Sequence, residues 1–344
     1  MISEKQLIEI REHLDKATNP LFFFDDDPDG LTSFLLLKRK YKKGGCVPMK
    51  TTFATEAFYL PKIAEYKPDK VFLLDKPVVS QEILDHIDVP VIWIDHHQPL
   101  TFPDSPHINY YNPMTTTPGD NTCTSNICYN VVRQDEWLAL IGIISDWQAP
   151  SFIKDFTYKD LLDNKTTAPE IFFESQYGTL VKFFTFLLKG DYEDVKKSIG
   201  ILETVQSPRD LLNPTTPETR YLYSRFEVYN KEYGQLYQDA FSQKHDENLF
   251  VYTYAATKTS FTGLLSNELL YNLDSEIIIV GRIKDGDVLM SLRSKKVDVL
   301  PILEKALKNV QGHGGGHLRA CGAGVKQEDF PKFIDIIKKE LTQK

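Results

Sequence analysis

A chain of 344 residues with 42% hydrophobic and 12% aromatic content is long enough for two domains with buried cores, which excludes a chain that is disordered throughout. Its apolar runs are far too short to cross a bilayer, and its charged N-terminal segment is unlike a secretion signal, so we expect no membrane association. The net charge of −8 excludes a protein that coats long duplex nucleic acid, although a small phosphate-binding site remains compatible with it. Four scattered cysteines without a CxxC pair indicate reduced thiols in a cytoplasmic protein.

The first half of the chain predicts a parallel α/β sheet. Residues 5–17 have the spacing of an amphipathic helix. Three short apolar runs at 21–24, 71–74 and 91–94 are each bounded by polar residues or proline, which predicts buried parallel strands with helices between them. The basic residues within 38–43 are predicted to be the solvated end of the helix that follows the first strand.

The second half is predicted to be helical at first and then mixed. Residues from about 155 to 240 have helical spacing, and the remaining segments form a second, smaller α/β domain. Its expected elements are a strand within 248–257, a hairpin at 275–294 that turns at Asp285-Gly286, a helix at 298–310, a glycine-rich loop at 311–324 and a closing helix at 328–341.

Acidic and histidine residues follow each of the three predicted strands at once. They are Asp25, Asp26, Asp27 and Asp29 after the first strand, Asp75 after the second, and Asp95, His96 and His97 after the third. Ligands bind at the carboxyl ends of parallel strands, so we expect these side chains to share one edge of the sheet. Asp146, at the end of the apolar segment 137–147, is expected to join them.

Such a set of carboxylates and imidazoles is typical of a metal centre. These donors suit Mn²⁺, Mg²⁺, Fe²⁺ or Zn²⁺, and the lack of thiolates argues against a structural zinc site. The carboxylates repel one another and exceed the need of one ion, so two ions that activate a water for attack at phosphorus are expected. Any single aspartate has a simpler explanation, and Asp29 could cap the helix after the first strand. Asp95 is expected to orient a histidine.

The glycine-rich segment is a candidate anion-binding element. Its backbone N–H groups are free of side chains, which suits close approach of a phosphate. His317 and Arg319 add donors, and Arg293 lies on a predicted strand that could face the same cleft. The alternatives are a turn without function for the glycines and an exposed surface residue for Arg293.

Four parts of the sequence follow one another in the order DDDPDG, Asp75, DHH at 95–97 and Asp146. Together they resemble the four-part signature of the DHH phosphoesterase superfamily. The segment GGGHLRACG resembles the glycine-rich motif of the DHHA1 domain. The resemblance covers about 21–150 and 250–344. It implies an α/β fold class: a Rossmann-like DHH domain with a parallel sheet at 1–155, a helical connector at 156–245 and a smaller α/β DHHA1 substrate-binding domain at 246–344.

The resemblance also implies roles for individual residues. The implied ligands of two Mn²⁺ ions, with Mg²⁺ as the alternative, are Asp25, Asp27, Asp29, Asp75, His96 and Asp146. His97, supported by Asp95, would lie at the substrate side and carry the catalytic role. The implied ligands of a terminal phosphate or base are Gly314, Gly315, Gly316 and His317, with Arg293 or Arg319.

Two departures within the first motif narrow the expected function. Asp25 stands where NrnA-like members have histidine, and Leu31 stands where they have a further aspartate. This form of the first motif is closer to that of RecJ-like members, including the archaeal ones. The acidic balance disfavours a nuclease that tracks long strands. We therefore expect a phosphodiesterase, or exonuclease, that releases nucleoside monophosphates from single-stranded DNA or RNA or from short oligonucleotides by means of a water activated at two metal ions.

Two alternatives remain. One is a phosphodiesterase or phosphatase for small nucleotides, such as a cyclic dinucleotide or a phosphorylated nucleoside. The other is a weakly active scaffold that binds replication or repair proteins. The choice between DNA and RNA, the polarity of cleavage and the oligomeric state stay open.

Overall fold

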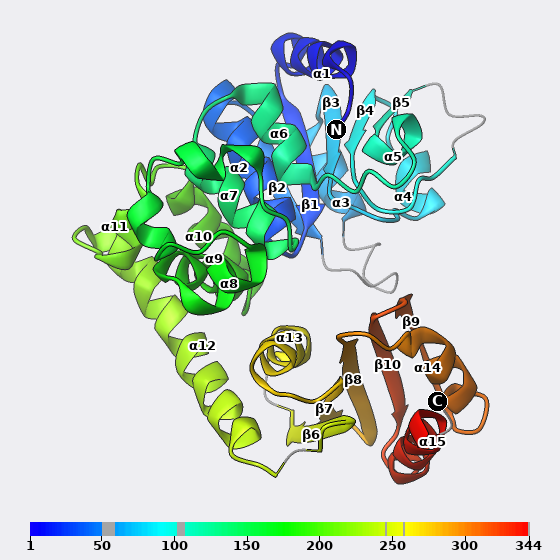
Figure 1. The fold of residues 1–344 in the computed structure, drawn as a ribbon. Coiled ribbons are helices and arrows are strands. Elements are labelled where there is room, and N and C mark those ends of the chain that lie inside the picture. The colour runs from blue at the N-terminus through cyan, green and yellow to red at the C-terminus, as the bar shows by residue number, and fades with distance from the viewer. Residues whose placement is uncertain (50–58, 102–106, 245, 257–258, 343–344) are drawn as a thin grey trace. The chain divides into compact units, whose positions relative to one another are not determined.

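The computed structural model describes residues 1–49, 59–101, 107–244, 246–256 and 259–342, in two compact units, Met1–Phe226 and Glu227–Lys344 (Figure 1). Residue 257, at the end of one expected strand, lies outside the described residues. Within those ranges, no helix combines the length and the apolar character that a membrane span requires.

The first unit contains a five-stranded parallel sheet in the order β2-β1-β3-β4-β5. Its strands are β1 (Pro20–Asp25), β2 (Gly45–Met49), β3 (Lys70–Leu74), β4 (Val91–Ile94) and β5 (Ile108–Tyr111). The expected strands at 21–24, 71–74 and 91–94 are confirmed as β1, β3 and β4. The strands β2 and β5 were not predicted. They lie at the two edges of the sheet, where Pro48 in β2 and the half-buried residues of β5 hide the usual apolar signal.

Helices cover both faces of this sheet. Phe22 and Phe24 point to α2 (Pro28–Tyr41), where the ring of Phe34 stacks on Phe24 with centroids 5.2 Å apart. Alternate residues such as Phe23 and Trp93 face the other way, into a core closed by α3 (Leu60–Tyr66) and α4 (Gln81–Asp85). Because both faces are buried, these strands are continuous apolar runs rather than alternating ones.

The remaining helices of this unit follow or flank the sheet. They are α1 (Glu4–Lys16), α5 (Pro113–Thr116), α6 (Thr124–Val132), α7 (Glu136–Ser145), the 3₁₀ helices η2 (Ser151–Asp155) and η3 (Lys159–Leu162), α8 (Ala168–Glu174), α9 (Gln176–Leu187), α10 (Tyr192–Leu202), α11 (Pro208–Leu212) and the first part of α12 (Pro217–Phe241). The boundary between the two units thus falls inside α12. The division into 1–155, 156–245 and 246–344 stays a prediction.

The basic segment 38–43 is a solvated helix end only in part: Lys40 and Lys42 are exposed, as expected, but the side chain of Arg39 is not. Arg39 donates to both carboxylate oxygens of Asp135, at 2.9 and 3.0 Å, and to the carbonyl oxygen of Glu203 at 3.2 Å. Lys38 donates to the carbonyl oxygen of Gly44, and Lys43 to that of Ala17. A guanidinium has five donors in a fixed fork, so one buried arginine can tie α2 to both the start of α7 and the chain after α10.

The second unit contains a mixed sheet in the order β6-β7-β8-β10-β9, in which β6 and β7 are parallel and the other neighbours antiparallel. Its elements are β6 (Leu249–Ala255), α13 (Thr262–Asn272), β7 (Ile277–Lys284), β8 (Asp287–Ser294), α14 (Val299–Leu307), β9 (Gly312–His317), β10 (Ala320–Lys326) and α15 (Phe330–Thr342). The expected hairpin is confirmed, and Asp285 and Gly286, with φ of 52° and 81°, form its turn.

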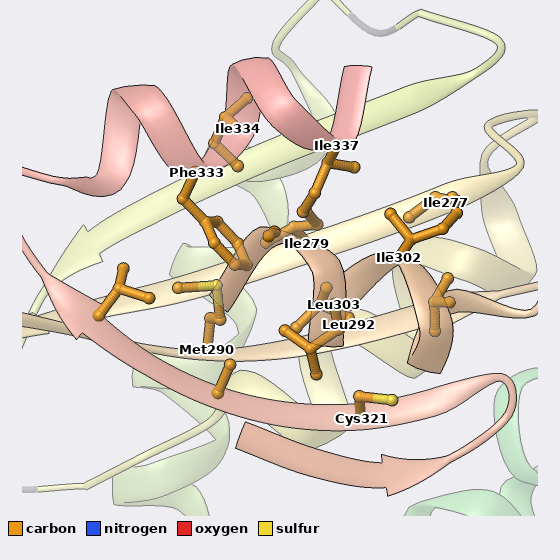
Figure 2. Packing of buried hydrophobic residues seen from close by; sticks show 14 of the residues in the cluster. Ile277, Ile279, Met290, Leu292, Ile302, Leu303, Cys321, Phe333, Ile334 and Ile337 are labelled. Carbon is orange, nitrogen blue, oxygen red and sulfur yellow. The ribbon is translucent and has the colours of Figure 1, made fainter. Parts of the chain in front are cut away.

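One face of this sheet is closed by α14 and α15. Met290 and Leu292 of β8 pack against Leu303 of α14 and against Phe333 and Ile337 of α15 (Figure 2). A parallel sheet in the first unit and a mixed sheet in the smaller second unit confirm the predicted α/β class.

The glycine-rich segment 311–324 is not a loop. Residues 312–317 form the edge strand β9, which pairs with β10 from His317 opposite Ala320 to Gly312 opposite Val325. Glycine disfavours a strand, but β10 anchors this one because Cys321, Ala323 and Val325 are buried in the core. The ladder with β10 therefore overrides the local preference of the glycines.

Candidate metal centre

The acidic residues gather where the chain order of the parallel sheet reverses. Asp25 is the last residue of β1, Asp75 follows β3, and Asp95 follows β4. The order β2-β1-β3 makes the gap between β1 and β3 the switch point of the sheet, which is the usual ligand-binding position in such folds.

Gly30 sets the approach of α2 to this edge. Asp27 caps the helix, and its Oδ1 accepts the N–H of Gly30 at 2.9 Å. A Cβ on Gly30 would lie 2.6 Å from the carbonyl oxygen of Asp25, so only glycine allows the helix to begin directly against the end of β1. Asp27 and Asp29 are thereby held beside Asp25.

Asp29 joins α2 to α6 rather than capping α2. Its two buried oxygens accept the N–H groups of Thr124 and Ser125 in the first turn of α6, both at 2.9 Å. This carboxylate therefore lies at the positive end of a second helix. Each of its oxygens keeps a further lone pair that can face a cation.

Asp75, His96 and His97 form the tightest metal-type cluster among the described residues, with one ligand atom from each within 4.8 Å of the others. His96 Nε2 lies 3.3 Å from Asp75 Oδ1, while its Nδ1 lies 3.2 Å from the carbonyl oxygen of Asn121. A carbonyl can only accept, so Nδ1 carries the hydrogen and the lone pair of Nε2 points to Asp75. Asp75 has a φ of 59°, a left-handed conformation that is uncommon outside glycine.

Asp146 reaches the same group from the end of α7. Its Oδ2 lies 3.7 Å from His96 Nδ1 and accepts the side-chain amide of Gln148 at 2.9 Å. Thr124 adds a further contact, because its hydroxyl donates to Asp75 Oδ1 at 3.1 Å. The structure thus brings the predicted residues of β1, α2, β3, β4 and α7 to one place.

Asp95 holds His97 rather than facing the centre. It is fully buried, and its Oδ1 lies 2.8 Å from His97 Nδ1. Its Oδ2 accepts the His97 N–H at 3.1 Å, the Tyr110 hydroxyl at 3.3 Å and the Asn112 amide at 3.4 Å. These donors fix the carboxylate, and the carboxylate fixes the ring so that Nε2 of His97 faces outward.

Lys76 belongs to this group and was missed by the sequence analysis. Its side chain is 2% exposed, and its ammonium donates to Asp25 Oδ1 at 2.8 Å. The indole N–H of Trp93 donates to the backbone carbonyl of Lys76 at 2.9 Å and holds this turn in place. A lysine beside an aspartate is ordinarily a surface pair, so the sequence carried no signal for its burial.

Burial and mutual repulsion raise the pKa of the carboxyl groups. Desolvation, followed by the charges of Asp25 and Asp29, raises the pKa of Asp27 to about 7. Desolvation, followed by the charges of Asp29 and Asp27, raises the pKa of Asp146 to about 9. The pKa of Asp75 is raised well above its usual value by the same two causes. Such a cluster gains most from a neutralising cation, and its oxygen and imidazole donors fit Mn²⁺ or Mg²⁺.

The two histidines differ in protonation. Burial lowers the pKa of His96, which favours the neutral ring that a metal requires. Burial would also lower the pKa of His97, but the hydrogen bond and charge of Asp95 outweigh it and raise that pKa. The pair therefore combines a neutral imidazole with one that holds a proton more readily.

In the second unit, three of the predicted substrate residues, Arg293, Gly315 and His317, lie on the sheet face opposite the α14–α15 core. Arg293, Ala320 and His317 are direct neighbours across β8, β10 and β9, so their side chains share this face. Arg293 is held by Asn267 at 2.8 Å and by the carbonyl oxygens of Leu292 and Cys321. Burial lowers its pKa.

The glycines on β9 and β10 divide into two classes. A Cβ on Gly314 or Gly316 would lie within 3 Å of β10 backbone, so these two glycines are needed for strand packing. A Cβ on Gly315 would meet nothing within 4 Å, and one on Gly322 would touch only a backbone oxygen at 3.9 Å. Gly315 and Gly322 are opposite each other and leave the sheet face bare, which permits close approach of a ligand. Gly322, on β10, was not predicted.

Arg319 lies apart from this face, in the two-residue connection between β9 and β10. It is exposed, its Nη1 donates to the carbonyl oxygen of Lys295 at 3.3 Å, and its Nε lies 3.5 Å from Asp298 Oδ1. Of the two predicted arginines, Arg293 is thus the one in the same register as His317.

Comparisons with known proteins agree with this architecture. The family model of the DHH family, N-terminal domain, matches residues 21–148, and that of the DHHA1 domain matches residues 246–343. No curated protein sequence matches the chain.

Several solved structures share its fold, among them two of RecJ and one of a pGpG-specific phosphodiesterase. RecJ from Thermus thermophilus, in complex with Mn²⁺, is 16% identical with a TM-score of 0.69, and the match covers 100% of this chain and 55% of that one. An exonuclease RecJ bound to manganese is 17% identical with a TM-score of 0.65, covering 100% and 96%. The pGpG-specific phosphodiesterase PggH from Vibrio cholerae is 15% identical with a TM-score of 0.55, covering 95% and 99%.

The two family matches lie in the expected order and together span both units of the structure. The first contains every acidic and histidine residue of the centre, and the second contains the bare glycine face. The chain therefore contains the N-terminal domain of the DHH family followed by a DHHA1 domain, in a fold similar to that of RecJ.

Proposed function

We propose that this chain is a metal-dependent phosphodiesterase that releases nucleoside monophosphates from single-stranded nucleic acid or short oligonucleotides. The observation that carries the proposal is the convergence of Asp75, His96 and His97, whose ligand atoms lie within 4.8 Å of one another at the switch point of the parallel sheet. Asp27, Asp29 and Asp146 surround them and extend the donor set.

We assign the ligand role to Asp27, Asp29, Asp75, His96 and Asp146, with Mn²⁺ or Mg²⁺ as the ion. The predicted ligand role of Asp25 stays part of this proposal, and its Oδ1 also accepts a hydrogen bond from the ammonium of Lys76. A bound divalent ion supplies Lewis acidity toward a phosphodiester and toward water. The protein contributes fixed donors, because Asp29 and Asp75 are oriented by Thr124 and Asp146 by Gln148.

His97 is proposed as the residue that handles the proton and charge of the reaction. Its Nδ1 is engaged by Asp95, so Nε2 is the atom left for substrate. A raised pKa favours the protonated ring, which can stabilise charge on a phosphoryl oxygen or protonate the departing alkoxide. Asp95 acts through His97 and is a positioning residue.

The bare sheet face of the second unit is proposed to bind substrate phosphate. Arg293 and His317 supply donors, and Gly315 with Gly322 leaves room for a phosphate to approach the backbone. Gly314 and Gly316 support this strand from the other side, and Arg319 at the hairpin end is proposed as a second, exposed contact.

The test is the Mn²⁺-dependent release of mononucleotides from end-labelled single-stranded DNA, single-stranded RNA and the dinucleotide pGpG by the full chain. Asp75→Ala and His96→Ala should reduce release to background with the fold retained, because each removes a donor from the central cluster. His86→Ala is the matched control, since His86 is an exposed histidine directly after α4 and its replacement should leave activity unchanged.

The substrates that the chain hydrolyses distinguish the nuclease from the small-nucleotide phosphodiesterase and from the scaffold. Turnover of pGpG without turnover of longer strands would favour the small-nucleotide alternative, which the fold of PggH supports. No turnover of any substrate, together with a stable complex with replication proteins, would reject the enzyme and favour the scaffold.

A further inference from the structure

Trp147 directly follows Asp146 and ends α7 in an unusual way. The Gln148 N–H donates to the carbonyl oxygen of Ile143 at 3.0 Å, and the Trp147 N–H donates to that of Ile144 at 3.1 Å. This pair of bonds is the Schellman helix end, in which the residue at the position of Trp147 is usually glycine. Trp147 has a φ of 60°, the left-handed conformation that such an end requires.

A bulky side chain is disfavoured in this conformation. The Cβ of any residue other than glycine crowds the following carbonyl when the backbone is left-handed. Residues kept in such conformations cluster at functional sites, where the side chain has a role that offsets the strain. Helices α2, α3 and α6 also end at a left-handed residue other than glycine, namely Lys42, Lys67 and Arg133, so this conformation alone is explained by helix termination. What remains to be explained at Trp147 is the size and the exposure of its side chain.

The indole ring lies on an aromatic cluster formed with α8. Its centroid is 5.3 Å from that of Phe172 and 5.7 Å from that of Phe173, and these two rings stack on each other with an interplanar angle of 3°. The ammonium of Lys182 lies 6.0 Å from the Phe173 ring centroid. The ring of Trp147 thus packs on the two phenylalanine rings of α8, and Lys182 places a cation near one of them.

Trp147 differs from the other two tryptophans of the chain in exposure. It is 41% exposed, whereas Trp93 and Trp137 are buried. A ring that served packing alone would gain more from full burial, because transfer of its surface from water is the source of that stabilisation. The structure instead leaves part of this large aromatic residue in solvent, next to Asp146 in the sequence.

We propose that Trp147 stacks on a nucleobase of the substrate, the base of the nucleotide that is held at the metal centre. This inference rests on the proposed function and names the part of the substrate that the centre itself does not contact. Aromatic side chains stack on any base, because every base has a π face, and they do so when the base is unpaired. Trp147 thereby favours single-stranded over duplex substrate without selecting a sequence.

The experiment pairs a change in the protein with a change in the substrate. The Michaelis constant is measured for a short single-stranded oligonucleotide and for the same backbone with abasic residues, using the wild type, Trp147→Ala and Trp147→Phe. We expect Trp147→Ala to raise the KM for the base-containing strand about tenfold, and to leave the KM for the abasic strand unchanged. Trp147→Phe should restore most of the difference, since phenylalanine also stacks.

Binding has a separate readout in the fluorescence of the chain. Titration with a phosphorothioate-linked oligonucleotide in the presence of Mn²⁺ should quench tryptophan emission in the wild type. The Trp147→Phe variant should show little quenching, because its remaining indoles, Trp93 and Trp137, are buried. Phe241→Ala, which removes an exposed aromatic side chain from α12, is the control and should behave as the wild type in both assays.

An equal rise of KM for the base-containing and abasic strands in Trp147→Ala would overturn the inference. It would mean that Trp147 supports the structure of the site and does not contact a base. Loss of the folded state in that variant is checked by thermal unfolding, and Trp147→Phe then carries the fluorescence test alone. Absence of turnover of every strand by the wild type would reject the proposed function instead, so the two failures are distinct.

Discussion

Neighbouring glycines of β9 have different surroundings, so some of them serve the packing of the strand and others can serve ligand binding. Gly316 has a φ of 143°, and its Cβ would lie 2.5 Å from the carbonyl oxygen of Ala320, whereas a Cβ on Gly315 would meet nothing within 4 Å. The sequence GGGH presents the three glycines as equivalent. Only the pairing with β10 distinguishes them.

We predict that Gly316→Ala lowers the free energy of unfolding by about 1–3 kcal/mol, because it combines a clash with an unfavourable backbone conformation. Gly315→Ala should change stability by less than about 0.5 kcal/mol but raise the KM for oligonucleotides, because its methyl group fills the bare face. Denaturant unfolding and steady-state kinetics measure the two effects. Equal losses of stability in both variants would contradict the division of these glycines.

Several site residues gave no signal in the sequence. Lys76, Thr124 and Gln148 are ordinary polar residues in ordinary contexts, and each acquires its place only because α6, α7 and the turn after β3 meet. Asp29 was expected to be a residue of the centre, but its hydrogen-bond partners in α6 lie 95 and 96 residues away in the sequence. Long-range partners of this kind are decided by packing.

Among the elements, α2 does most to place the centre. Its first turn carries Asp27 and Asp29, and Gly30 lets that turn contact the end of β1. The sequence predicted this helix and the strand before it, since an apolar run followed by a capping aspartate and a helical pattern is a strong local signal. The contact distance between them is a property of the fold.

Gly30→Ala should lower the free energy of unfolding by about 1–3 kcal/mol, because the added methyl group must push α2 away from β1. The displacement should also weaken Mn²⁺ binding, measured by calorimetry. Gly200→Ala is the matched control, since Gly200 is exposed within α10 and has open space around it. That change should raise stability by about 0.5–1 kcal/mol. Unaltered Mn²⁺ affinity in Gly30→Ala would contradict the proposed positioning.

For the whole molecule without metal, the crowded carboxyl groups of the centre make the free energy of unfolding depend on pH. The pKa of Asp27 is raised to about 7 and that of Asp146 to about 9, both far above the value of 3.8 for an isolated aspartate. Between pH 3.8 and these raised pKa values, the carboxyl groups of the folded chain hold protons that those of the unfolded chain have released. The free energy of unfolding therefore falls as pH rises through this window.

We predict that the melting temperature of the metal-free protein falls from about pH 5 to about pH 8, and that Mn²⁺ raises it more at the higher pH, where fewer protons must be displaced. Thermal unfolding with EDTA or with Mn²⁺ across this range measures both effects. Asp146→Asn should flatten the metal-free profile. A metal-free melting temperature that rises steadily with pH would contradict the assigned cluster.

The sequence by itself determined the α/β class, three of the five parallel strands, the β7–β8 hairpin and the family resemblance, because these depend on local runs, turn residues and motif spacing. It did not determine the edge strands β2, β5 and β9. Glycine and proline in β2 and β9 oppose a strand until a neighbour supplies the hydrogen-bond ladder, and β5 has only four residues, most of them half-buried. It also did not distinguish Gly315 from Gly316, or reveal the burial of Lys76 and the exposure of Trp147. Those features depend on what lies across from each residue, and tertiary structure alone fixes the distance between segments far apart in the chain.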